Sequence, residues 1–184
     1  GTLDAAAAID VDSGSAIIDT ADAGSSLTVL ARAGELTLDT GSAGTTATLT
    51  KQGGTGQLAV TTLTSGGDTT IASSTDAILG SVTSSGGNVV VDSVGATDGD
   101  TIDAAGLIDV DGGSVDIGTA DAGTSLSLLA QSGQLTLGTG TAGTTASLTK
   151  EGATGALQAT KLTSGGSATI TSSTDTSLGT VTST

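Results

Sequence analysis

The chain contains a long internal repeat without gaps. Residues 1–85 align with residues 100–184 at a constant offset of 99, and about 55 of these 85 positions are identical. The run Thr-Ala-Asp-Ala-Gly at 20–24, for example, returns at 119–123. A fixed period without insertions is typical of folds in which each unit stacks on a copy of itself. The sequence therefore predicts a fold that grows along one axis, and it disfavours a globular enzyme.

A shorter period lies within the long one. Glycines at the ends of turn-like segments divide the chain into spans of 17 to 23 residues, and five consecutive spans make up the 99-residue unit. We expect coils of about 20 residues, about nine coils in all, and a five-coil super-repeat, with copy one at 1–99 and a partial copy two at 100–184. The glycines used for this division are Gly24, Gly44, Gly67, Gly87, Gly106, Gly123, Gly143 and Gly166.

Each span opens with apolar residues at alternate positions, such as Leu-Thr-Val at 27–29, and a second alternating stretch follows, such as Leu-Thr-Leu at 36–38. Some spans hold a third short stretch, for example around Leu63. A spacing of two is the period of a strand with one buried face, and the abundant Gly, Ser and Thr disfavour helices. Parallel crossovers are nearly always right-handed. The sequence thus predicts an all-β fold, a right-handed parallel β-helix (β-solenoid), over 1–184 as a single segment.

This fold predicts which residues meet. Equivalent residues of neighbouring coils should stack, with Thr and Ser ladders on the outer face and Gly where the backbone turns with φ above zero. The expected stacks place Leu36 and Leu38 over Leu58 and Val60, and Leu135 and Leu137 over Leu157 and Ala159.

Composition narrows the possible chemistry. The chain has 30 Gly and no Pro, Cys, Met, Trp, Tyr, Phe or His. The interior must therefore be narrow and filled by Ala, Val, Ile and Leu, and Ser–His–Asp or Cys–His catalysis is excluded. The net charge of −15 disfavours nucleic acid and anionic lipid as partners.

The ends of the sequence show no targeting signal. No apolar run long enough for a signal peptide or for membrane insertion is present. The repeat pattern reaches both ends, so we expect the chain to be a segment of a larger protein.

Four segments share one pattern, in which Ala-Gly or Gly-Gly at a coil end leads into a short stretch of Val, Leu or Ile with Thr, Ser or Val. They lie at 23–29, 65–71, 85–91 and 122–128. This pattern resembles the repeats of filamentous haemagglutinin-type bacterial exoproteins, and the resemblance covers the whole chain. It implies a right-handed β-helical shaft of a very large secreted or surface-held adhesin, of the kind often exported by two-partner secretion. The nearly perfect 99-residue super-repeat departs from the pattern of that family.

Paired carboxylates are the main candidate site. Asp10 and Asp12 recur as Asp109 and Asp111, and residues two apart on a strand share a face. Hard oxygen ligands of this kind suit Ca²⁺. The alternative is a solvated acidic face that resists edge pairing. Further acids lie close to these pairs in the sequence, namely Asp4, Asp92, Asp98, Asp100 and Asp103.

Three other activities have weaker sequence support. A glycosidase would need aromatic sugar platforms, which the chain lacks, and a β-helical polysaccharide lyase would need basic residues beyond Arg32, Lys51, Lys150 and Lys161. Ice binding by Thr-x-Thr rows, such as 48–50, would require a flat lattice. The variable coil length disfavours such a lattice.

The sequence therefore predicts a non-catalytic shaft segment of an extracellular or cell-surface bacterial adhesin, with no cofactor except possible Ca²⁺. Its expected partners are adjacent repeats of the same protein, with head-to-tail or lateral self-association possible, and the receptor would bind outside this segment. The alternative is a subunit of a self-assembling extracellular fibre, sheath or surface layer, and a remote alternative is a polysaccharide lyase.

Overall fold

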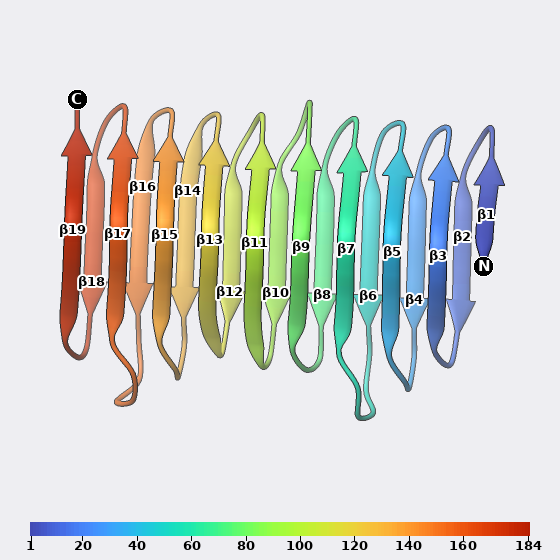
Figure 1. Cartoon of the computed structure of the whole chain (residues 1–184), viewed down its shortest axis with the longest axis horizontal. Coiled ribbons are helices and arrows are strands. Elements are labelled where there is room, and N and C mark those ends of the chain that lie inside the picture. Colours follow the sequence, from blue (N-terminus) through green and yellow to red (C-terminus); the bar gives the residue numbers. More distant parts are fainter.

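The computed structural model describes residues 1–184, which form two parallel sheets and no helix (Figure 1). The long-strand sheet contains β1 (Thr2–Ala5), β3 (Ala16–Ala23), β5 (Leu36–Ala43), β7 (Leu58–Ser65), β9 (Ala77–Ser84), β11 (Ala96–Ala104), β13 (Ser114–Ala122), β15 (Leu135–Ala142), β17 (Leu157–Ser164) and β19 (Thr176–Ser183). The short-strand sheet contains β2 (Ile9–Ser13), β4 (Leu27–Ala31), β6 (Ala47–Lys51), β8 (Thr69–Ser73), β10 (Val89–Ser93), β12 (Ile108–Gly112), β14 (Ser125–Ala130), β16 (Thr145–Lys150) and β18 (Ala168–Ser172).

The chain alternates between the two sheets, and each strand pairs in parallel with the strand one coil away. In Figure 1 the nearer strands run upward, the farther strands run downward, and the chain advances from right to left, which is a right-handed coil. The predicted right-handed β-solenoid of about nine coils with about 20 residues each is confirmed. At a strand spacing of roughly 4.8 Å, the rod is about 43 Å long.

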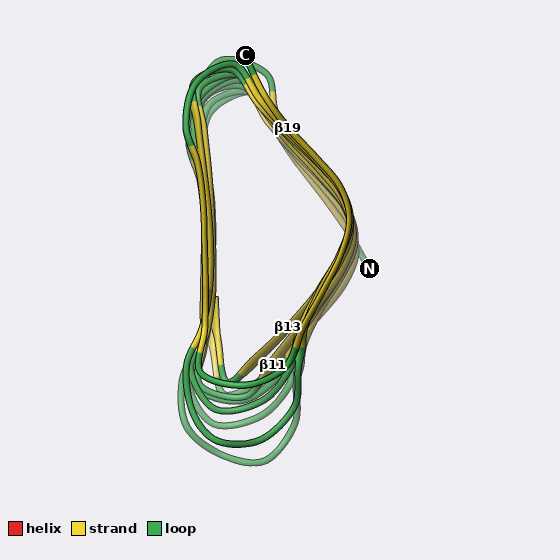
Figure 2. Ribbon diagram, turned by 90° about the vertical axis from the view of Figure 1, so that its left-hand side faces the viewer, coloured by secondary structure: helices red, strands yellow, loops and turns green.

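The cross-section has three sides (Figure 2). The short strands form one straight side, whereas each long strand bends at its middle. In β5, inward residues alternate up to Leu38, two consecutive outward residues follow, and the alternation resumes at Gly41. The third alternating stretch expected from the sequence is therefore not a separate strand. It is the second arm of a long strand, beyond the bend.

The observed register confirms the predicted stacking. Leu36 and Leu38 lie beside Leu58 and Val60, and the corresponding residues of copy two pair in the same way. The glycine division made two spans one residue too long, because it placed their ends at Gly67 and Gly166. Ala43 pairs with Ser65 and Ala142 pairs with Ser164, so the residues beside Gly44 and Gly143 are Gly66 and Gly165.

One continuous core of 40 buried residues fills the rod. Its members are small or β-branched residues and leucines, as the composition requires. On the outer surface the expected hydroxyl ladder runs along the bend of the long strands, in register from coil to coil. Its members include Thr20, Thr40, Thr62, Ser81, Thr101, Thr119 and Thr139.

The expected role of glycine is only partly correct. Positive φ angles occur only at Gly53, Gly54, Gly56, Gly152 and Gly155, all in the two longest turns. The other turn glycines are required by close packing instead. A Cβ on Gly44, for example, would lie 2.2 Å from the carbonyl oxygen of Gly24 in the preceding coil. Turns that stack at the spacing of parallel strands leave no room for a side chain there.

Much of the variation in coil length is accommodated in the turns. The longest turns, at 52–57 and 151–156, protrude from the same edge of the rod (Figures 1 and 2). The flanking strands keep their pairing, since Lys51 lies beside both Ala31 and Ser73. Insertions therefore change the edge of the rod and leave both sheets continuous.

Candidate functional site

The four predicted calcium ligands lie on the outer face of the short-strand sheet. Asp10 and Asp12 belong to β2, at one end of the sheet, and Asp109 and Asp111 belong to β12. Strands β4, β6, β8 and β10 separate the two pairs. Each pair shares a face as expected, but the structure does not bring the two pairs together.

The two acid pairs have different surroundings although their sequences are identical. Arg32, in the next coil, donates two hydrogen bonds to Asp12, from Nε to Oδ1 at 2.7 Å and from Nη2 to Oδ2 at 2.5 Å. The hydrogen bond from Arg32 lowers the pKa of Asp12, and the positive charge of the guanidinium adds to this effect. Copy two has Gln131 in place of Arg32, so Asp111 lacks this partner.

Burial raises the pKa of Asp111, and the charges of Asp109, Asp92 and Glu151 raise it further. Asp92 is the residue directly beside Asp111 on β10. In copy two, the negative charges around Asp111 repel one another. In copy one, Asp12 instead forms an ion pair with Arg32.

A second like-charged row lies on the long-strand sheet, where Asp98 pairs with Asp116. Burial raises the pKa of Asp116, and the charge of Asp98 contributes. Like charges directly opposite each other on neighbouring strands are destabilising. Nowhere in residues 1–184 do three acidic side chains gather in an arrangement suited to a metal ion.

These shifts predict that mild acid stabilises the acidic middle of the rod. The pKa values of Asp111 and Asp116 are raised above their unfolded values, so their charged forms oppose folding, and stability is gained as the pH falls through the folded pKa values towards 3.8. Replacing Asp111 with Asn should raise the stability at pH 7 by about 0.5 kcal/mol. The substitution should also reduce the gain in stability on acidification.

The matched variant is Asp12→Asn, which removes the acid that Arg32 binds. This change should destabilise the chain at pH 7, because a group with a lowered pKa contributes stability above its unfolded pKa. Thermal unfolding followed by circular dichroism compares both variants from about pH 3, below the usual Asp pKa of about 3.9, to about pH 7. Shifts of the same sign in the two variants would contradict the pKa directions.

Two lysines lie in the interior, which the sequence interpretation missed. Lys51 and Lys150 are each 1% exposed. Nζ of Lys51 donates a hydrogen bond to the carbonyl oxygen of Gly53 at 2.9 Å, and Nζ of Lys150 donates to those of Glu151 and Gly152 at 2.9 Å each. Each lysine therefore caps the long turn that follows it. The sequence signal for the burial of Lys51 was the alternation Ala-x-Leu-x-Lys at 47–51, because the lysine occupies the next inward position of the strand.

The remaining cations do not form a basic cleft. Arg32 binds Asp12, and Lys161 lies exposed on the long-strand sheet, in the row that is otherwise Thr or Ser. A substrate carboxylate, as in a lyase reaction, would thus meet no cluster of positive charge.

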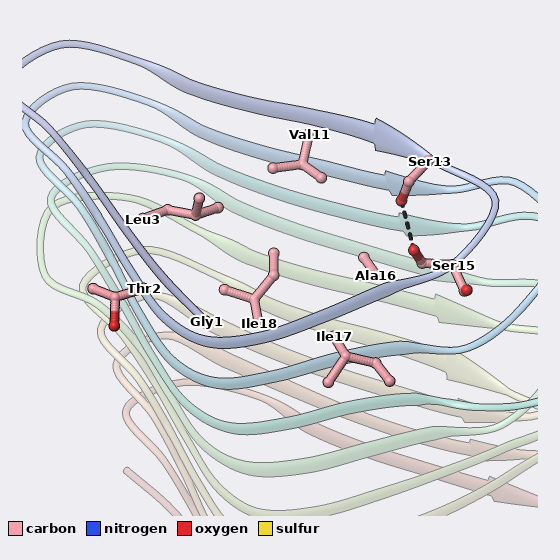
Figure 3. Close-up of a pocket in the computed structure, with 9 residues that line it drawn as sticks. All are labelled: Gly1, Thr2, Leu3, Val11, Ser13, Ser15, Ala16, Ile17 and Ile18. Atoms are coloured by element: carbon pink, nitrogen blue, oxygen red, sulfur yellow. Dashed lines mark hydrogen bonds between the residues drawn. The ribbon is translucent and has the colours of Figure 1, made fainter.

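Two concavities are present. A polar one of about 470 Å³ lies beside the turn at 52–57 and is lined by Glu35, Thr37, Gly56, Gln57, Thr75 and Asp76. An apolar one of about 320 Å³ lies at the N-terminal end of the rod. The polar hollow holds two acids and no cation. The apolar one (Figure 3) is lined by residues of β1, β2 and β3 together with Gly1 and Ser15.

Neither concavity brings side chains together in an arrangement that is specific to one reaction. Comparison with protein-family models, curated proteins and solved structures gives no match. The structure contains no helix long and apolar enough to cross a membrane. A function is therefore inferred from the architecture and surface of the rod.

Proposed function

We propose that residues 1–184 form a structural shaft segment of a secreted or surface-held bacterial adhesin, similar to the shafts of filamentous haemagglutinin-type proteins. The observation that supports this proposal is the unbroken pairing of equivalent strands along both sheets. Such a stack can be lengthened by whole coils without changing its cross-section, which is what a spacer requires. The acidic, hydroxyl-rich surface lacks the aromatic residues that usually anchor protein or sugar ligands.

Removing one super-repeat tests this role. Deletion of residues 50–148 joins Leu49 to Thr149, the counterpart of Thr50, so every inward face stays in phase. We expect a folded rod shortened by about 24 Å, five coils at roughly 4.8 Å each. Small-angle scattering of the purified segment measures this change. Deletion of 50–139 is the matched control, because it joins Leu49 to Gly140 out of register and should unfold the junction.

The same deletions in the native protein test adhesion. Cells that display the protein shortened by one super-repeat should still adhere, with a shorter reach, because the receptor would bind elsewhere in the protein. Beads coated with residues 1–184 alone should not adhere to the surfaces that the whole protein recognises. Adhesion of these beads at the level of the whole protein would make this segment the binding region and refute the shaft role.

A fibre or surface-layer subunit is the second candidate. The observation in its favour is that both sheets are continuous parallel stacks, which coils of another copy could extend. Spontaneous head-to-tail polymers of the purified chain, strengthened when salt screens the −15 charge, would favour this candidate over the shaft. Sedimentation at low and moderate salt distinguishes the two.

A further inference from the structure

Negative charge is concentrated in the middle of the rod. Residues 89–122 contain eight of the 19 acidic residues of the chain and no lysine or arginine. This stretch runs from β10 to β13 (Figure 1), with β10 and β11 in one coil and β12 and β13 in the next. The contact between these two coils is named the junction.

Aspartates lie directly side by side on all three sides of the junction. One pair is on the short-strand sheet, one is on the first arms of the long strands, and one is on their second arms. The pairs are Asp92 with Asp111, Asp98 with Asp116, and Asp103 with Asp121. No other two adjacent coils bring aspartates together on all three sides. Because like charges opposite each other on neighbouring strands are destabilising, the two coils repel each other around the whole cross-section (Figure 2).

No positive charge beside the pairs offsets this repulsion. The position that holds Arg32 in copy one holds Gln131 here, and Asp109 and Glu151 add negative charge around Asp111. Beyond each pair, the next strand on either side supplies an uncharged outward residue. These residues are Ala72, Ile78 and Thr83 on one side of the junction, and Leu129, Thr136 and Thr141 on the other.

Apolar packing holds the junction closed against this repulsion. Val91 lies beside Val110, and Ile102 lies beside Ala120. All four side chains point inward and are buried. The junction is therefore a continuous part of the core whose closure is opposed by charges on the surface alone.

We infer that the junction is a joint of the rod, which opens more readily than the contacts between its other coils. Opening separates β10 from β12 and β11 from β13, and it leaves two stacks connected by the turn at 105–107. Each stack keeps its own strand pairing, so the rod yields at one defined place. The joint follows from the strand registers in the middle of the chain, and it does not depend on the proposed shaft role.

Salt and pH should control how often the joint opens. Salt weakens the repulsion because the Debye length falls from about 10 Å at 0.1 M to about 3 Å at 1 M. Burial and neighbouring negative charges raise the pKa values of Asp111 and Asp116, so their charged forms oppose closure. Closure is therefore strengthened as the pH falls through these raised values towards 3.8. The joint is loosest at neutral pH and low salt.

Thiol labelling measures the opening, because the chain has no cysteine of its own. Ala104→Cys places one thiol at the last inward position of β11, and Ala142→Cys places one at the equivalent position of β15. Both alanines are 2% exposed. At pH 7 and low salt, labelling relative to the denatured chain should be about tenfold faster in the β11 variant. At about 1 M salt most of this difference should disappear.

Two triple variants distinguish the aspartate pairs from the net charge of the chain. The first removes one acid from each pair and should slow labelling of the β11 variant to about the rate of the β15 variant. It combines Asp92→Asn, Asp98→Asn and Asp103→Asn. The second neutralises three acids in turns outside the pairs and should leave the labelling rate almost unchanged. It combines Asp68→Asn, Asp76→Asn and Asp175→Asn.

Hydrogen exchange of the unsubstituted 184-residue chain gives an independent measurement. At pH 7, amides that bond across the junction should be less protected than those between β4 and β6. Their protection, relative to the intrinsic exchange rates at each pH, should rise at about pH 4. Equal labelling of the two cysteine variants, an equal effect of the two triple variants, or junction amides as protected as those between β4 and β6 would each overturn the inference.

Discussion

Leu38→Asp is expected to lower the free energy of unfolding by about 3–5 kcal/mol. Leu38 is 0% exposed and packs in the core between Ile18 and Val60 of the adjacent coils. A carboxylate there would be surrounded by apolar side chains, and the buried Lys51 is already hydrogen-bonded to the turn carbonyl of Gly53. The coil would have to open on at least one side to hydrate the charge.

The neighbouring substitution Thr37→Asp is the matched control. Thr37 is on the outer face of the same strand, so a carboxylate at this position remains hydrated, and the expected cost is below about 1 kcal/mol. Urea denaturation followed by circular dichroism compares the two variants, because the chain has no aromatic residue for fluorescence. Equal losses for both variants would show that the inward face has been assigned wrongly.

Lys51→Ala is expected to lower the free energy of unfolding by about 2–4 kcal/mol, although lysine is usually a tolerant surface residue. The side chain is buried, and its Nζ lies 2.9 Å from the carbonyl oxygen of Gly53 and 3.4 Å from Oγ of Ser74. Truncation removes the aliphatic stem from the core and leaves the carbonyl of the long turn without its donor. Both effects oppose folding of the coil that carries this turn.

Two further substitutions separate the causes. Lys51→Met keeps most of the stem and removes the hydrogen bonds, so it should cost about 1–2 kcal/mol. Lys161→Ala removes an exposed lysine and should change stability by less than about 0.5 kcal/mol. If Lys51→Met were as stable as the parent chain, the stem alone would support the turn, and the capping role of Nζ would be wrong.

Local alternation was sufficient to predict the strands and their buried faces. In a parallel stack, an inward residue contacts the inward residues of adjacent coils, so a period of two along the chain and a period of about 20 between coils together determine the core. Leu36, Leu38, Leu58 and Val60 were assigned correctly for this reason. The same logic predicted that Asp10 and Asp12 share a face, but it said nothing of what lies beside them.

Other properties of the chain depend on residues in neighbouring coils, and only the tertiary structure decided them. Asp12 and Asp111 have the same local sequence context, yet their pKa values shift in opposite directions. Arg32, one coil away, lowers the pKa of Asp12. Burial and the neighbouring negative charges raise the pKa of Asp111, which has Gln131 in place of that arginine. The bend that joins two arms into one long strand, and the burial of Lys51 beneath its turn, likewise depend on packing across the coil. The sequence by itself determined the period, the strands and their inward faces. The pairing between coils determined the charge environment and the cross-section, because those properties arise from contacts between residues about 20 positions apart.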